Sequence, residues 1–125
     1  MAGQLLVKRV YDDADGSDGY RILADRLWPR GVSKERAKID LWIKDLTPSD
    51  QLRKRYHDND LDYKRFASEY RQELDSLSPD LADLKSIKDK LSVGPVTCVT
   101  SVKDIEHSHI PTLSAYLLEM TSRSS

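Results

Sequence analysis

Acidic and basic side chains stand next to each other where the predicted strands of this 125-residue chain end. The pairs are Asp25-Arg26, Lys44-Asp45 and Lys103-Asp104. Arginine offers a rigid fork of donors to phosphate or carboxylate, lysine adds a point charge, and aspartate orients a cation or accepts a proton. Because sites in open α/β sheets form beyond the carboxyl ends of the strands, this pattern predicts an anion-binding polar site there.

The densest part of the pattern is the segment 18–31, which places three arginines around one apolar strand. The arginines are Arg21, Arg26 and Arg30. Arginine is rarely buried unless it is paired, so this density indicates a preorganised polar site beside a packed wall. We interpret Trp28 and Trp42 as core or wall residues rather than as platforms for base stacking.

Two sets of residues are predicted at this site. The residues predicted to hold the anion are Arg21, Arg26, Arg30, Lys44 and Lys103. The residues predicted to orient a cation or move a proton are Asp25, Asp104 and His107, since histidine titrates near neutral pH. The expected ligand is a small phosphorylated or carboxylated compound or a nucleotide. The sequence predicts neither a particular cofactor nor an oligomeric state.

Metal and thiol chemistry are not predicted. His107 and His109 stand two residues apart, and only His57 and Cys98 add to them, whereas zinc needs three or four ligands. Cys98 lies inside an apolar strand, where a thiol behaves as a small hydrophobic side chain. Glycine-rich phosphate loops and nucleophile elbows do not occur in the sequence.

Composition indicates one soluble domain. The net charge is −1, charged residues make up 33% and apolar residues 38% of the chain. We predict a single domain over residues 1–120 with a frayed tail at 121–125. The lone cysteine, the short first apolar run and the lack of a membrane-spanning run predict a cytoplasmic protein without a membrane partner.

A basic segment supports a second hypothesis, namely a nucleic-acid-binding module. Seven basic residues stand against three acidic ones between Arg21 and Lys44, and Arg53-Lys54-Arg55 adds a further run. A third hypothesis is a structural or regulatory protein in which the same charges form only a buried ion-pair network.

Alternating strand and helix patterns predict the fold. Strands are expected at 5–11, 19–25, 39–44 and 96–100. The first two are close enough in sequence to be antiparallel neighbours, and the sequence leaves their pairing open. Helices are expected after the caps Ser33, Thr47-Pro48 and Ser78-Pro79, over 63–77 and from Ile110 onward. The class is therefore α/β, a single domain with a mainly parallel sheet of about four strands covered by helices.

Several segments resemble the YeaO-like branch of a large family known only as a domain of unknown function. The matching segments are 10–11, 18–31, 44–46 with 49 and 52–53, 70 with 73–74, and 96–107. The most specific of them is Asp25-Arg26-Leu27-Trp28-Pro29-Arg30-Gly31. The resemblance implies a small cytosolic α/β protein and supplies no activity, substrate or catalytic residue. Ser108 departs from the asparagine that related proteins often carry, and the Cys-His-Arg motif of more distant branches is missing.

Overall fold

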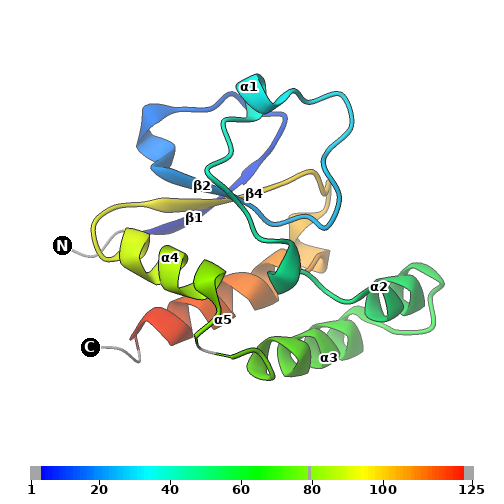
Figure 1. Ribbon diagram of the computed structural model, residues 1–125. Coiled ribbons are helices and arrows are strands. Elements are labelled where there is room, and N and C mark those ends of the chain that lie inside the picture. Colours follow the sequence, from blue (N-terminus) through cyan, green and yellow to red (C-terminus); the bar gives the residue numbers. More distant parts are fainter. Residues whose placement is uncertain (1–3, 79, 123–125) are drawn as a thin grey trace.

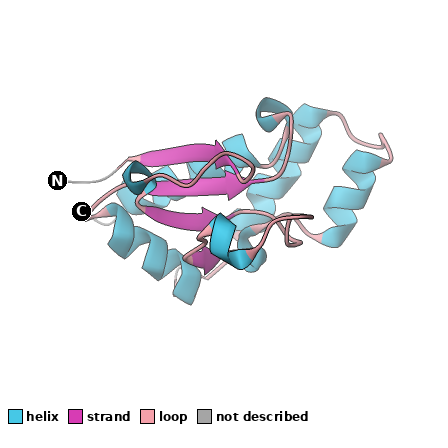
Figure 2. Cartoon of the chain, turned by 90° about the horizontal axis from the view of Figure 1, so that it is seen from above, coloured by secondary structure: helices cyan, strands magenta, loops and turns pink. Residues whose placement is uncertain are grey.

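A four-stranded parallel sheet forms the centre of the computed structural model, which describes residues 4–78 and 80–122 (Figure 1). In their order across the sheet the strands are β1 (Leu5–Arg9), β4 (Val96–Thr100), β2 (Tyr20–Leu23) and β3 (Leu41–Trp42). Every neighbouring pair is parallel, and Figure 2 shows the arrows pointing the same way. The predicted α/β class and its parallel sheet are confirmed.

The first two strands, whose pairing the sequence left open, are not antiparallel neighbours. β4 lies between β1 and β2 and pairs with both, so that Cys98 faces Val7 on one side and Ile22 on the other. All of β4 is buried. A strand buried on both faces belongs in the middle of a parallel sheet, and β4 therefore separates two strands that are close in sequence.

Gly19 allows β2 to start directly against β4. Its φ is +67°, and a Cβ at this position would lie 2.1 Å from the carbonyl oxygen of Pro95. The Tyr20 N–H donates to that same oxygen at 3.0 Å. A side chain at Gly19 would push the two strands apart where their pairing begins.

The helices cover the two faces of the sheet unequally (Figure 1). α4 (Ala82–Leu91) and α5 (Ile110–Ser122) lie on one face, and α3 (Tyr63–Asp75) packs against α5. Their apolar side chains form the main core together with Ile22, Ala24 and Cys98. The short α1 (Lys34–Ala37), capped by Ser33 as predicted, closes a smaller cluster on the opposite face.

α2 (Asp50–His57) and α3 form a helical hairpin, and α2 extends past the carboxyl ends of the strands (Figures 1 and 2). Glu73 of α3 accepts hydrogen bonds from the backbone N–H and the hydroxyl of Ser49 at 2.9 and 2.6 Å. Phe66, Tyr70 and Leu74 are buried along the predicted apolar face of α3. The hairpin is thereby fixed beside the edge of the sheet where a site was expected.

Two predicted helix starts are wrong. Ser49, not Thr47, caps α2, because the Thr47 hydroxyl donates to the Lys44 carbonyl at 2.6 Å within the 3-10 turn η2 (Lys44–Leu46). α4 begins after Leu81 rather than at Ser78, whose hydroxyl accepts from the Asp80 N–H instead. Pro79 lies outside the described residues.

Other element ends differ from the expected ones by a few residues. The pairing of β3 with β2 covers only Leu41 and Trp42, since Ile39 packs instead into the smaller cluster. α5 continues through Thr121 to Ser122. The remainder of the predicted tail, residues 123–125, lies outside the described residues.

Candidate functional site

The carboxyl ends of β2 and β4 are joined through Asp25. Its carboxylate accepts hydrogen bonds from the Thr100 hydroxyl at 2.6 Å and from the backbone N–H and hydroxyl of Ser101, both at 2.7 Å. Asp25 is only 7% exposed. The acid predicted at this strand end is therefore part of a network that ties the second strand to the fourth.

The loop after β4 is held by the tyrosines of the helical hairpin. The Tyr56 hydroxyl donates to the His107 carbonyl and the Tyr63 hydroxyl to the Ser108 carbonyl, each at 2.9 Å. Phe66 stacks on Tyr56 with 4.3 Å between the ring centroids. An aromatic wall thus faces the loop that leaves the sheet.

A cavity of about 440 Å³ lies between these two parts of the structure. It is lined by residues 25–27, 47–48, 53, 56–57, 66, 101–102, 104 and 107–109. The lining comes from the segment after β2, residues 47–48 before α2, the loop after β4 and the helices α2 and α3. Its size is that of small-molecule sites, which are mostly apolar with a few placed polar groups.

Two guanidinium groups share one carboxylate at this cavity. Arg26 Nε lies 2.8 Å and Arg53 Nη2 lies 3.3 Å from the same oxygen of Asp50, which is itself an exposed residue. The buried Nε of Arg53 has no hydrogen-bond partner among the described residues. This pair of arginines carries one positive charge more than its carboxylate compensates.

His109 lies between the sheet and the cavity. Its Nε2 hydrogen-bonds the Ala24 carbonyl oxygen, which requires the proton to be on Nε2, and it lies 3.9 Å from Asp25. Burial lowers the pKa of His109, and the charge of Arg53 adds to this, against the opposing effects of Ala24 and Asp25. The ring is therefore neutral near neutral pH.

Asp104 and His107 lie at the outer side of the same cavity. His107 Nδ1 is 2.8 Å from the Asp104 carboxylate, and both side chains are more than 60% exposed. The His107 ring meets Tyr63 edge to face at 5.4 Å. The structure therefore places Asp104 and His107 at the same cavity as Asp25 and Arg26, which are four of the predicted site residues.

Four of the predicted anion-binding residues do not line this cavity. Arg21 is buried, donates to the Ala37 carbonyl and forms a 2.6 Å ion pair with Asp18. Lys44 lies over the Trp42 ring at 4.2 Å, and Arg30 and Lys103 are exposed. Arg21 lies within β2 rather than at its end, Lys44 lies in the turn η2, and Arg30 and Lys103 lie outside the strands. Closeness to a strand end in the sequence therefore did not bring these side chains to the cavity.

The two tryptophans, Trp28 and Trp42, pack against each other and do not line the cavity. Their rings meet edge to face at 5.6 Å, Trp28 donates to the Val32 carbonyl and Trp42 to the Asp25 carbonyl. Trp28 also packs against the smaller core cluster. Their role as core and wall residues agrees with the interpretation from the sequence.

Three residues of the site were not identified as such from the sequence: Arg53, Ser101 and His109. Arg53 was assigned only to the basic run, in which Arg55 is paired with Glu69 at 2.7 Å. Ser101 and His109 come after β4 in the chain, so the expectation of a site beyond the carboxyl ends of the strands could have included them. His109 was considered only as a metal ligand.

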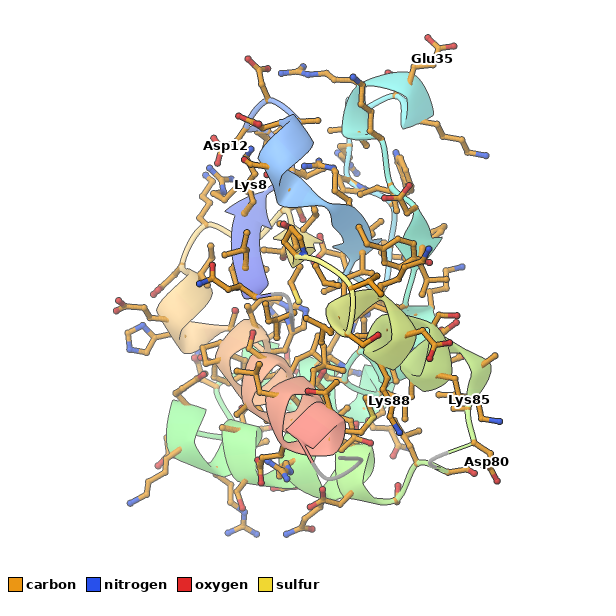
Figure 3. All side chains as sticks on the ribbon, turned by 90° about the vertical axis from the view of Figure 1, so that its left-hand side faces the viewer. Lys8, Asp12, Glu35, Asp80, Lys85 and Lys88 are labelled. Carbon is orange, nitrogen blue, oxygen red and sulfur yellow. The ribbon has the colours of Figure 1, made fainter. Side chains whose placement is uncertain are left out.

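A second hollow lies between α3, α4 and α5, and several of its charged side chains pair with one another. Lys85 and Lys88 lie on its α4 side near Asp80 (Figure 3), while Arg71 bonds both Asp75 and Glu119 at 2.9 and 2.6 Å. The cavity beside Asp25 is therefore the stronger candidate.

Within residues 4–78 and 80–122, no helix is long and apolar enough to cross a membrane.

The fold and the site define a small α/β domain with an open cavity at the carboxyl edge of a parallel sheet. The chain belongs to the DUF488-N3i family, described as the inactive DUF488-N3 subclade, whose model matches residues 4–125. This confirms the family resemblance seen in the sequence.

Curated relatives cover nearly the same length. The chain is similar to the uncharacterized protein YeaO of Escherichia coli, with 43% identity over 110 residues, 88% of this chain and 93% of the relative. It is also 39% identical over 111 residues to the uncharacterized proteins Mb3100c of Mycobacterium bovis and Rv3073c of Mycobacterium tuberculosis, covering 89% of this chain and 91% of each relative. No solved structure gave a significant match.

Proposed function

We propose that this protein binds a small organic anion in the cavity beside Asp25, without itself turning the ligand over. Arg26 and Arg53 hold the anionic group, and the apolar lining, which includes Leu27 and Phe66, covers the rest of the ligand. The proposal places the protein in the cytoplasm, which suits a buried, unpaired Cys98.

The observation that carries this proposal is the uneven charge at Asp50. Two guanidinium groups use one exposed carboxylate, and the buried Arg53 Nε has no partner in the described part of the chain. Arg26 and Arg53 both line the cavity, so an acceptor bound there would add to the single carboxylate that the two guanidinium groups share. Carboxylate and phosphate oxygens fit the guanidinium fork best.

Binding without turnover is supported by the family description and by the site. The matching family is described as an inactive subclade. Asp25 is already occupied by three hydrogen bonds, and Asp104 and His107 are largely exposed and bonded to each other. We assign these three residues to ligand positioning rather than to proton transfer, which modifies the role predicted from the sequence.

The nucleic-acid hypothesis has less support. Of the arginines on which it depends, Arg21 is buried in an ion pair and Arg55 is paired with Glu69. Arg26 is partly neutralised by Asp50. A small ligand in the cavity contacts both Arg26 and Arg53, which line it, whereas the paired arginines offer little to an extended phosphate backbone.

Thermal denaturation with a panel of nucleotides, phosphosugars and carboxylates tests the proposal. A ligand above its dissociation constant raises the melting temperature of the wild type by mass action. Arg26→Met and Arg53→Met should abolish that rise while changing the free energy of unfolding by less than about 1 kcal/mol, as for exposed ion pairs. Arg65→Met, on the exposed Arg65–Glu69 pair, is the matched control and should keep it.

Asp50→Asn provides a test in the opposite direction. Removing the shared carboxylate frees both guanidinium groups, so anion affinity should increase. A panel that shifts nothing, or arginine variants that unfold the protein while Asp50→Asn leaves affinity unchanged, would show that these charges belong to the scaffold.

A further inference from the structure

Asp25 carries a buried negative charge for which the described part of the chain provides no positive partner. Its side chain is 9% exposed, and the one basic group within 4 Å is His109, which is neutral near neutral pH. Its three hydrogen-bond donors, on Thr100 and Ser101, are uncharged. Burying a carboxylate without a counter-charge is unfavourable, and hydrogen bonds offset this only in part.

Asp18 provides a direct comparison within the same molecule. Its side chain is 8% exposed, nearly the same as that of Asp25, but it is paired with two cations. Lys8 lies 3.2 Å away and Arg21 lies 2.6 Å away, and Lys8, on β1, is labelled in Figure 3. Asp18 does not line the cavity, whereas Asp25 does. The uncompensated aspartate is the one that a ligand can reach.

The charges that line the cavity are balanced rather than uniformly positive. Arg26 and Arg53 contribute two positive charges, and Asp25 and Asp104 contribute two negative ones. His109 lies 3.9 Å from Asp25, and the charges of both Asp25 and Arg53 affect its pKa. A negative and a positive charge therefore lie near the same histidine. A polyanion held by the arginines would meet these carboxylates and that of Asp50, which disfavours a highly charged phosphate.

We infer that the ligand is a small organic zwitterion, such as an amino acid with an apolar or aromatic side chain. Its carboxylate binds Arg26 and Arg53, and its ammonium group supplies the cation that Asp25 lacks. Phe66, Tyr56 and Leu27 cover its apolar part. A volume of about 440 Å³ is sufficient for such a molecule. This inference rests on the proposed anion site and names its ligand class.

Three matched probes test the inference on the wild-type protein by isothermal titration calorimetry. They are L-phenylalanine, 3-phenylpropionate, which lacks the ammonium group, and 2-phenylethylamine, which lacks the carboxylate. L-leucine and 4-methylpentanoate form an aliphatic pair of the same design. Each zwitterion should bind about tenfold more tightly, or more, than its analogue, because a charge-assisted hydrogen bond is lost in the analogue.

Failure of this inference is distinguishable from failure of the proposed function. If 3-phenylpropionate binds as tightly as L-phenylalanine, or if only phosphorylated compounds bind, the inference of a zwitterionic ligand is wrong. The proposed anion-binding function is then still supported. If no carboxylate or phosphate compound binds at all, both are wrong.

The variant Asp25→Asn tests whether Asp25 binds the ammonium group of the ligand. The variant should reduce the affinity for L-phenylalanine to that for 3-phenylpropionate and leave the latter unchanged. Asp12→Asn, an exposed position (Figure 3), is the matched control and should bind both probes as the wild type does. Equal loss of both probes in a folded Asp25→Asn variant would contradict the assignment, and the wild-type comparison remains decisive if that variant does not fold.

Discussion

Asp25 and Ser101 connect the ends of two neighbouring parallel strands through one carboxylate oxygen. That oxygen accepts both the backbone N–H and the hydroxyl of Ser101 at 2.7 Å, while the other accepts the Thr100 hydroxyl. The same carboxylate lines the cavity. Its contribution to stability is measured by denaturation, and its contribution to binding is measured by titration calorimetry.

Asp25→Ala should destabilise the protein by about 3 kcal/mol, because it leaves the donors of Thr100 and Ser101 without an acceptor. Urea denaturation gives the free energy of unfolding. Asp12→Ala removes an exposed carboxylate and should change it by less than about 0.5 kcal/mol. Equal values for the two variants would show that the network at the strand ends contributes nothing to stability.

Glu73→Gln should cost about 2 kcal/mol, since the carboxylate of Glu73 accepts both donors of Ser49, the cap of α2. The amide protons of α2 should then exchange faster, as measured by hydrogen–deuterium exchange. Glu35→Gln, at the outer end of α1 (Figure 3), is the control. Unchanged exchange in α2 would contradict this role of Glu73.

His109 should make stability depend on pH. Because burial lowers its pKa in the folded state below the unfolded value of about 6.5, the unfolded chain binds more protons as pH falls. Stability should therefore be full above about pH 7 and decrease toward pH 5.5, by at most about 1.4 kcal/mol per pH unit. His109→Gln keeps a donor for Ala24 and should flatten the profile in urea melts; parallel profiles would refute this.

Phe66→Ala should cost about 3–5 kcal/mol, because Phe66 is 3% exposed and stacks on Tyr56 in the main core. Phe66→Leu retains most of the buried volume and should cost markedly less. Chemical denaturation measures both. A loss below about 1 kcal/mol for Phe66→Ala would mean that this face of α3 does not support the core.

Local patterns in the sequence were sufficient for much of the fold. The four-residue spacing of Phe66, Tyr70 and Leu74 predicts the buried face of α3, and the apolar run 96–100 predicts β4 with its correct bounds. These features depend on side chains close together in the chain, and such periodicity is directly visible in a sequence.

The order of the strands and the composition of the cavity were decided only by the tertiary structure. Asp25 meets Thr100 and Ser101 because β4 inserts beside β2, a pairing between residues 75 or more positions apart that no local pattern encodes. Arg53 joins Arg26 because the helical hairpin folds back over the edge of the sheet. The sequence by itself determined the elements and the acid at the strand end, whereas packing between distant elements selected which charges share a site.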